Sequence, residues 1–93
     1  MAEDLIVTVA EIAGTCPVYK LGDSFVIEKG YILKAREGIC LHALASILPF
    51  YTSLARGVSP EELGLGREDA FVQCPDPCRI TNGGTVIFRI SRG

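Results

Sequence analysis

Four cysteines are the residues of this sequence best suited to chemistry: Cys16, Cys40, Cys74 and Cys78. Thiolate sulfur is a preferred ligand of zinc and of iron–sulfur clusters, and four thiolates complete a tetrahedral site. Cys74 and Cys78 enclose the stretch P-D-P, in which the two prolines restrict the backbone. We therefore hypothesise a thiolate site that binds zinc or iron, the latter also as an iron–sulfur cluster, or that carries out redox chemistry.

The spacing of the cysteines leaves alternatives open. Only Cys74 and Cys78 are close in sequence, and three residues separate them, whereas a zinc knuckle has two. Cys16 and Cys74 both precede proline, which favours an extended backbone, and each lies near the end of a predicted strand. Cys40 lies at the start of a predicted helix, where a thiol is a better ligand or nucleophile than in a core. Free cysteine is among the most buried residue types, so the alternative is a set of core thiols.

Three further residues are candidates for a role in chemistry: His42, Asp23 and Asp76. His42, the only histidine, is a candidate fourth ligand or general base. It is two residues from Cys40, however, and residues at this spacing lie on different faces of a helix. The alternative is a core or interface role. Asp23 and Asp76 occur in turn-forming sequences, so each is expected to accept backbone hydrogen bonds, with a role beside a thiolate as the alternative. No catalytic triad or phosphate-binding glycine loop is recognisable, so the sequence leaves open whether the protein is an enzyme.

Hydrophobic patterns predict the elements that must position these residues. Strands are expected at Leu5–Ile12, Ser24–Glu28, Tyr31–Leu33, Ala70–Cys74 and Thr85–Ile90. From Cys40 to Leu54, apolar residues recur at three- and four-residue steps, which indicates one helix face. Pro49 interrupts this pattern and predicts a kink, or two helices that meet at Leu48.

Turn signals complete the predicted order of elements. Ser59-Pro60-Glu61-Glu62 predicts one short helical turn, and Asn82-Gly83 predicts a hairpin turn before the last strand. Strands thus occur in adjacent blocks on either side of one helical segment. This order predicts an α+β fold in a single domain, residues 1–93, with a small, mainly antiparallel sheet of four or five strands packed against one kinked helix or a helix pair.

The composition predicts the partners and the compartment. Nine Lys and Arg against eleven Asp and Glu give a net charge of -2, which disfavours nucleic-acid binding. No apolar run reaches the roughly twenty residues that span a membrane, and the acidic start is untypical of a secretory signal, so we expect a cytoplasmic protein with reduced cysteines. The hydrophobic content of 48% is high for 93 residues and favours a homo-oligomer. The second hypothesis is therefore a non-catalytic homo-oligomeric interaction module with incidental core cysteines.

Several short motifs occur in an order that resembles a known family. They are Cys16-Pro17, Gly22-Asp23-x-Phe25, Gly38-Ile39-Cys40-x-x-Ala43, Pro49-Phe50 and Cys74-Pro75-Asp76-Pro77. Over nearly its whole length the chain is similar to a family of small cysteine-containing proteins found mainly in anaerobic bacteria and archaea. The resemblance implies a small cytoplasmic domain with cysteines at the positions of Cys16, Cys40 and Cys74, and it implies no activity. Because the family pattern lacks Cys78, it favours three thiolates plus another ligand, and an anaerobic setting suits iron–sulfur or ferrous chemistry.

Overall fold

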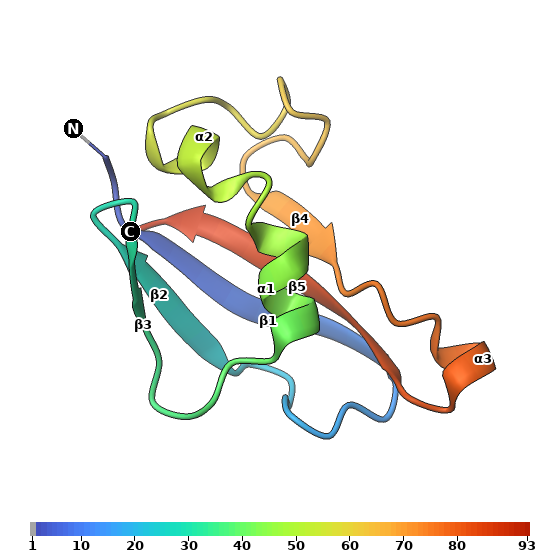
Figure 1. Ribbon diagram of the computed structural model, residues 1–93. Helices are drawn as coiled ribbons and strands as arrows, with labels where there is room; N and C mark the ends of the chain where they lie inside the picture. Colours follow the sequence, from blue (N-terminus) through green and yellow to red (C-terminus); the bar gives the residue numbers. More distant parts are fainter. Residues whose placement is uncertain (1) are drawn as a thin grey trace.

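The chain folds into one antiparallel sheet with a helical layer on one face (Figure 1). The computed structural model describes residues 2–93. The strands are β1 Leu5–Gly14, β2 Ser24–Glu28, β3 Ile32–Lys34, β4 Ala70–Gln73 and β5 Gly84–Arg92, and the helices are α1 Leu41–Ile47, α2 Tyr51–Ala55 and α3 Cys78–Thr81. The strand order is β3-β2-β1-β5-β4, with every neighbouring pair antiparallel. The predicted α+β class, with an antiparallel sheet against a helix pair, is confirmed.

The central strands β1 and β5 carry the core-facing row of the sheet. Val9 pairs with Phe88, and a bulge then shifts the register of β1. Because a bulge adds one residue to a strand, Ile12 rather than Glu11 continues the row that packs on the core. The bulge thereby allows the long strand β1 to keep an apolar face toward the helices along its whole length.

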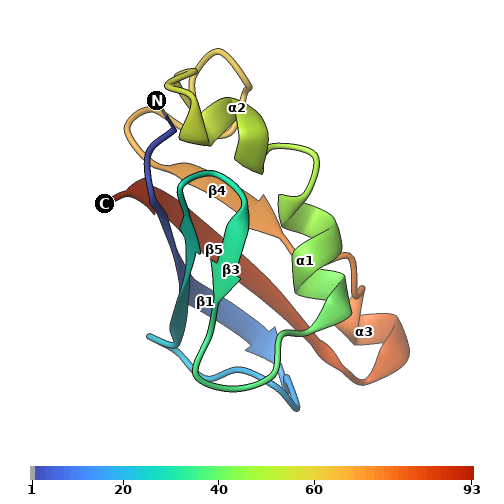
Figure 2. The same cartoon turned by 60° about the vertical axis from the view of Figure 1, so that its left-hand side comes forward.

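The hydrophobic core lies between the sheet and the helices α1 and α2, which Figure 2 shows on the same side of the sheet. The buried hydrophobic residues of the core are Leu5, Val7, Val9, Tyr19, Phe25, Ile27, Ala43, Ile47, Leu54, Ala55, Ala70, Val72, Cys74, Val86, Phe88 and Ile90. Within residues 2–93 no charged side chain is buried among them. Burial of this apolar surface is the main stabilising term of the fold.

Pro49 divides the helical segment in two, as the sequence predicts. α1 ends at Ile47, and the N–H of Phe50 donates to the Ile47 carbonyl at 3.0 Å before α2 begins. Proline has no N–H and clashes with the preceding turn, so a continuous helix is excluded here. Gly57 follows α2 with a φ of 93°, a left-handed conformation that favours glycine. No helix in residues 2–93 has the length and apolarity needed to cross a bilayer.

The predicted hairpin turn before the last strand is corrected by the structure. α3 was not predicted, and it lies between β4 and β5, so Asn82-Gly83 is not a two-residue hairpin turn. Asn82 instead ends α3 in the left-handed conformation, with a φ of 61°, a conformation that helix ends and hairpin turns share. After Ser59, the N–H groups of Glu62, Leu63 and Gly64 donate to the carbonyls three residues earlier, which agrees with the single short turn expected there. The Ser59 hydroxyl accepts a hydrogen bond from Glu62 N–H at 3.2 Å, as a cap would.

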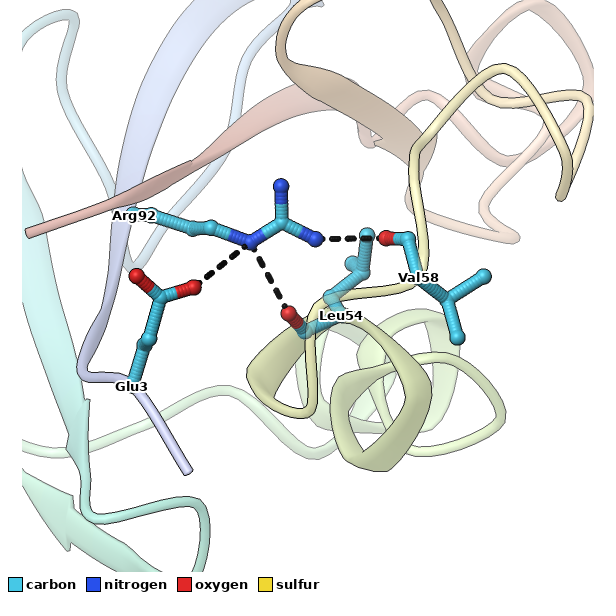
Figure 3. A network of polar contacts seen from close by, with 4 residues as sticks. All are labelled: Glu3, Leu54, Val58 and Arg92. Atoms are coloured by element: carbon cyan, nitrogen blue, oxygen red, sulfur yellow. Dashed lines mark hydrogen bonds and ion pairs between the residues drawn. The ribbon is translucent and has the colours of Figure 1, made fainter. Parts of the chain in front are cut away.

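Arg92, at the end of β5, ties the sheet to α2 (Figure 3). Its Nε donates to the Leu54 carbonyl at 3.1 Å, and its Nη2 donates to the Val58 carbonyl. The same Nε lies 3.1 Å from Oε2 of Glu3. Carbonyls in the last turn of a helix lack intrahelical partners, so a guanidinium with several donors suits this position. We call these contacts the Arg92 clasp.

Candidate functional site

Tyr19 makes hydrogen bonds to two of the four cysteines. Its backbone N–H donates to Sγ of Cys16, with a nitrogen–sulfur distance of 3.4 Å. Its hydroxyl oxygen accepts a hydrogen bond from the backbone N–H of Cys40 at 3.0 Å. Cys16 follows β1 and Cys40 directly precedes α1, so Tyr19 joins the end of the central strand to the start of the helical layer. We call Cys16, Tyr19 and Cys40 the thiol cluster.

Packing fixes the Tyr19 ring in place. The residue is only 8% exposed. Its ring stacks on Phe25 with centroids 6.5 Å apart, and it meets Phe88 edge-on at 5.6 Å. Offset-stacked and edge-to-face pairs of this kind are the favoured arrangements of aromatic rings. The hydroxyl of Tyr19 is therefore held at a defined position beside Cys40.

The pKa of Tyr19 is raised above its usual value, mainly because burial disfavours the phenolate. The hydrogen bond from Cys40 N–H opposes the rise, whereas the electrostatic influence of Cys40, Cys16 and Asp23 adds to it. The phenol thus stays protonated at neutral pH. Since its oxygen already accepts from Cys40 N–H, the hydroxyl proton can be donated to another acceptor, such as a thiolate.

Cys40 and Cys16 are each positioned by local backbone structure. Cys40 is the extended residue that precedes α1, with φ −68° and ψ 130°, and its carbonyl accepts from Leu44 N–H at 3.0 Å. Cys16 lies against Gly84: a Cβ atom at position 84 would be only 2.6 Å from the Cys16 nitrogen. Both cysteines are half-buried and pack against the core. Each residue is therefore more exposed than a cysteine of the core.

Cys74 is such a core cysteine, with 6% of its surface exposed. Its N–H donates to the Val86 carbonyl at 2.8 Å, which extends the pairing of β4 with β5 by one residue. Cys16, Cys40 and Cys74 therefore contribute to one hydrophobic cluster. In the described part of the chain, however, no three His, Cys, Asp or Glu side chains are grouped so that they could hold a metal ion.

Cys78 lies apart from this cluster. It begins α3 and lines a groove of about 340 Å³ together with Gln73 and Ile87, which belong to the sheet face opposite the core. Its N–H donates to Oγ1 of Thr85 at 3.3 Å. The turn through P-D-P thus places Cys74 and Cys78 on different sides of the sheet, although only three residues separate them.

The remaining candidate residues have structural surroundings. Asp76 accepts hydrogen bonds from the hydroxyl of Thr81 at its carboxylate and from that of Thr85 at its carbonyl, which stabilises the loop after β4. Asp23 accepts from Lys20 N–H at 2.9 Å, as expected of a turn residue. His42 is exposed on α1, so it does not lie in the core, and an interface role for it stays a prediction.

A cleft of about 370 Å³ adjoins Tyr19. Val18, Tyr19 and Phe25 line one part of it, and the segment from Ala35 to Ile39, which leads directly to Cys40, lines the other. In the sequence, Tyr19 is an aromatic residue typical of a core or an interface, and no motif links it to the cysteines. The available signal was chemical: a buried phenol needs a hydrogen-bond partner.

Comparisons with protein-family models, curated proteins and solved structures gave no match to this chain. The resemblance described from the motifs therefore stays a prediction.

Proposed function

We propose that the protein carries out thiol–disulfide exchange through Cys16 and Cys40, in the reducing cytoplasm that its sequence predicts. The observation that carries the proposal is the pair of hydrogen bonds by which Tyr19 contacts both cysteines. Cys16 and Cys40 are half-buried residues held by these hydrogen bonds, whereas Cys74 is buried in the core. Reactive cysteines occupy such partly exposed positions, and inert structural cysteines are buried.

The exchange needs two thiols and a substrate that contains a disulfide. One thiolate attacks the substrate disulfide, which gives a mixed disulfide and releases the first substrate thiol. The second cysteine then attacks the mixed disulfide, forms the Cys16–Cys40 disulfide and releases the second substrate thiol. Two electrons pass to the substrate, and the two leaving thiolates take up the two protons that the cysteines lose. Tyr19, protonated at neutral pH, stabilises a neighbouring thiolate by donating its hydroxyl hydrogen.

The test is equilibration of the purified protein with mixtures of reduced and oxidised glutathione, followed by mass spectrometry and peptide mapping. A Cys16–Cys40 disulfide should form and be reversed within the range of about −300 to −150 mV that such buffers and cells cover. The variants Cys16→Ser and Cys40→Ser should abolish it. Cys78→Ser is the matched control and should leave it unchanged, because Cys78 lies on the other side of the sheet. Free thiols at every potential in this range would overturn the proposal.

The same preparation tests the metal site expected from the sequence. Structural and catalytic zinc sites use at least three protein ligands. A metal at Cys16 and Cys40 would therefore have to recruit Cys74 or another ligand by rearrangement. Zinc or iron in a one-to-one ratio to the chain, lost in both Cys16→Ser and Cys74→Ser, would assign the cysteines to metal binding in place of disulfide exchange.

A second candidate function is that of a homo-oligomeric interaction module in which the cysteines are incidental. The observation that favours it is the exposure of large apolar side chains, with Leu41 at 78%, Ile80 at 77% and Tyr31 at 73%. Apolar surface that a single copy leaves in water is typical of an interface. A solution mass of twice the monomer or more tests this function, and a monomer at all concentrations would contradict it.

A further inference from the structure

Helix α1 is apolar on nearly all its sides. Ala43 and Ile47 are buried on the sheet, whereas Leu41 is 78% and Leu48, directly after the helix, is 51% exposed. Ala45, between these two leucines on the helix surface, is also exposed. An amphipathic surface helix has a polar outer face, whereas a helix that is apolar all round is normally buried. In both views no other segment of the chain lies over the outer face of α1, so this apolar face has no packing partner within one copy (Figures 1 and 2).

The pattern of residues on the outer face of α1 is self-complementary. Leu41, Leu44, Ala45 and Leu48 follow the spacing i, i+3, i+4 and i+7, so they form one stripe. The stripe has a leucine at each end and the small Ala45 near its middle. When two copies pack antiparallel about a two-fold axis, Leu41 therefore meets Leu48 of the partner subunit, and the alanines allow close approach of the helices. Two-fold interfaces require this self-complementarity.

Charge does not oppose such packing. The residues of α1 include no Asp, Glu, Lys or Arg, and the only polar ones are His42 and Ser46. The Ser46 hydroxyl donates to the Ala43 carbonyl at 2.7 Å, so it is already hydrogen-bonded within its own helix. Two facing copies of α1 thus bring together neither like charges nor unpaired serine hydroxyls.

The accessible surface of one copy exceeds that expected of a monomer by about the area of one interface. The accessible surface is 5987 Å², whereas a folded monomer of 10.0 kDa is expected to expose roughly 5240 Å². The excess is about 750 Å², close to the roughly 800 Å² per partner of a standard-size interface. A second copy of the chain is an occupant of the right size and character.

We infer that the outer stripe of α1, with Leu41, Ala45 and Leu48, is the two-fold interface of a homodimer. The inference rests on the second proposed function and specifies its contact surface. Burial of the stripe places the start of α1, and with it Cys40, next to the interface, so the dimer leaves access to the thiol cluster from the side of the cleft at Tyr19.

The test is the dissociation constant of the dimer, measured by sedimentation equilibrium over a concentration series. The double variant Leu41→Ser/Leu48→Ser should raise Kd by about 100-fold or more, because it removes four leucines from the dimer interface. Ile80→Ser is the matched control: Ile80 is as exposed as Leu41 but lies in α3, so this variant should leave Kd unchanged. Urea unfolding checks that both variants are folded.

A cross-link tests the same contact without weakening it. Ala45→Cys lies near its own symmetry mate in the antiparallel arrangement and should give a disulfide-linked dimer under mild oxidation. Glu62→Cys, exposed in the turn after Ser59, should not. A wild-type dimer that the leucine variants leave intact and Ala45→Cys does not link would overturn the α1 interface while the interaction module stands. A monomeric wild-type protein would overturn both.

Discussion

One residue joins neighbouring segments at each end of the central strand pair, and the two sets of contacts differ in chemistry. At one end, the Arg92 clasp joins a guanidinium to two backbone carbonyls and to Glu3. At the other, the neutral Tyr19 joins the sulfur of Cys16 to the backbone of Cys40. The clasp consists of groups that do no chemistry at neutral pH, whereas the thiol cluster contains two nucleophiles. Under the proposed exchange, the Tyr19 end carries the reacting groups, whereas the contacts at the Arg92 end serve only to stabilise the fold.

Gly84→Ala, a substitution next to Cys16 of the thiol cluster, is expected to change the free energy of unfolding most. The added methyl would lie 2.6 Å from the Cys16 nitrogen and 2.7 Å from the Thr15 carbonyl carbon, both backbone atoms that have little freedom to move. Overpacking of this kind should lower the free energy of unfolding by about 3 kcal/mol. Because the loop must shift, the rate at which Cys16 reacts with a thiol reagent should change as well. Urea unfolding and reaction with a chromogenic disulfide measure the two quantities.

Gly38→Ala is the matched control for this substitution. A Cβ atom at Gly38 has no neighbour within 4 Å, and the residue does not have a positive φ. The variant should therefore be neutral or stabilise the protein by up to about 1 kcal/mol through the unfolded state. Equal destabilisation by the two substitutions would show that the contact between Gly84 and Cys16 is not the cause.

Substitution at the clasp should separate stability from reactivity. Arg92→Met keeps an apolar stem but removes the donors to the carbonyls of Leu54 and Val58, which should cost about 2 kcal/mol. The thiol reactivity of the folded protein should stay unchanged. The control is Arg89→Met on the same strand, where Arg89 has only a long, exposed contact of 3.9 Å to Asp69 and should cost less than about 0.5 kcal/mol. Altered thiol reactivity in Arg92→Met would mean that the two ends are coupled.

The sequence predicted the parts of this comparison that depend on local signals. β2 was predicted at Ser24–Glu28, as observed, because turn residues bound it on both sides. The helix pair followed from Pro49, whose effect on a helix is local. α3 was missed because four residues are too few to display a helical period.

The contacts of the thiol cluster depend on tertiary packing and leave no periodic pattern. The bond between the Tyr19 hydroxyl and Cys40 spans 21 residues of chain, so only the folded arrangement of loop and helix creates it. The position of Cys78 could not be predicted from the sequence either. The path of the chain through P-D-P determines on which side of the sheet Cys78 lies, and the short spacing between Cys74 and Cys78 does not specify that path.

Tyr19→Phe should lower the free energy of unfolding less than Arg92→Met does. It should also change how the stability depends on pH. Loss of the hydroxyl leaves the Cys40 N–H without its acceptor and should cost about 1 kcal/mol at neutral pH. Because burial raises the pKa of Tyr19, the unfolded state loses this proton first as the pH rises. The wild-type protein should therefore lose stability as the pH rises above about 10, and the variant should lack this contribution.

Urea unfolding at neutral pH and in a series above pH 10 measures both parts of this prediction. Tyr31→Phe is the control, because Tyr31 is largely exposed and its loss of a hydroxyl should change neither part. A Tyr19→Phe protein with the alkaline response of the wild type would show that another group is responsible for it.

Glu3→Gln, in the Arg92 clasp, is expected to change the free energy of unfolding least. Glu3 lies 3.1 Å from Nε of Arg92, but about half of its side chain is exposed, so water and salt screen the pair. The variant should cost less than about 0.5 kcal/mol at low ionic strength and nothing measurable in concentrated salt, as determined by urea unfolding in both buffers. A cost close to that of Arg92→Met, independent of salt, would instead mean that the carboxylate orients the guanidinium toward Leu54 and Val58. The clasp would then act as one cooperative unit, in which no single contact has an energy of its own.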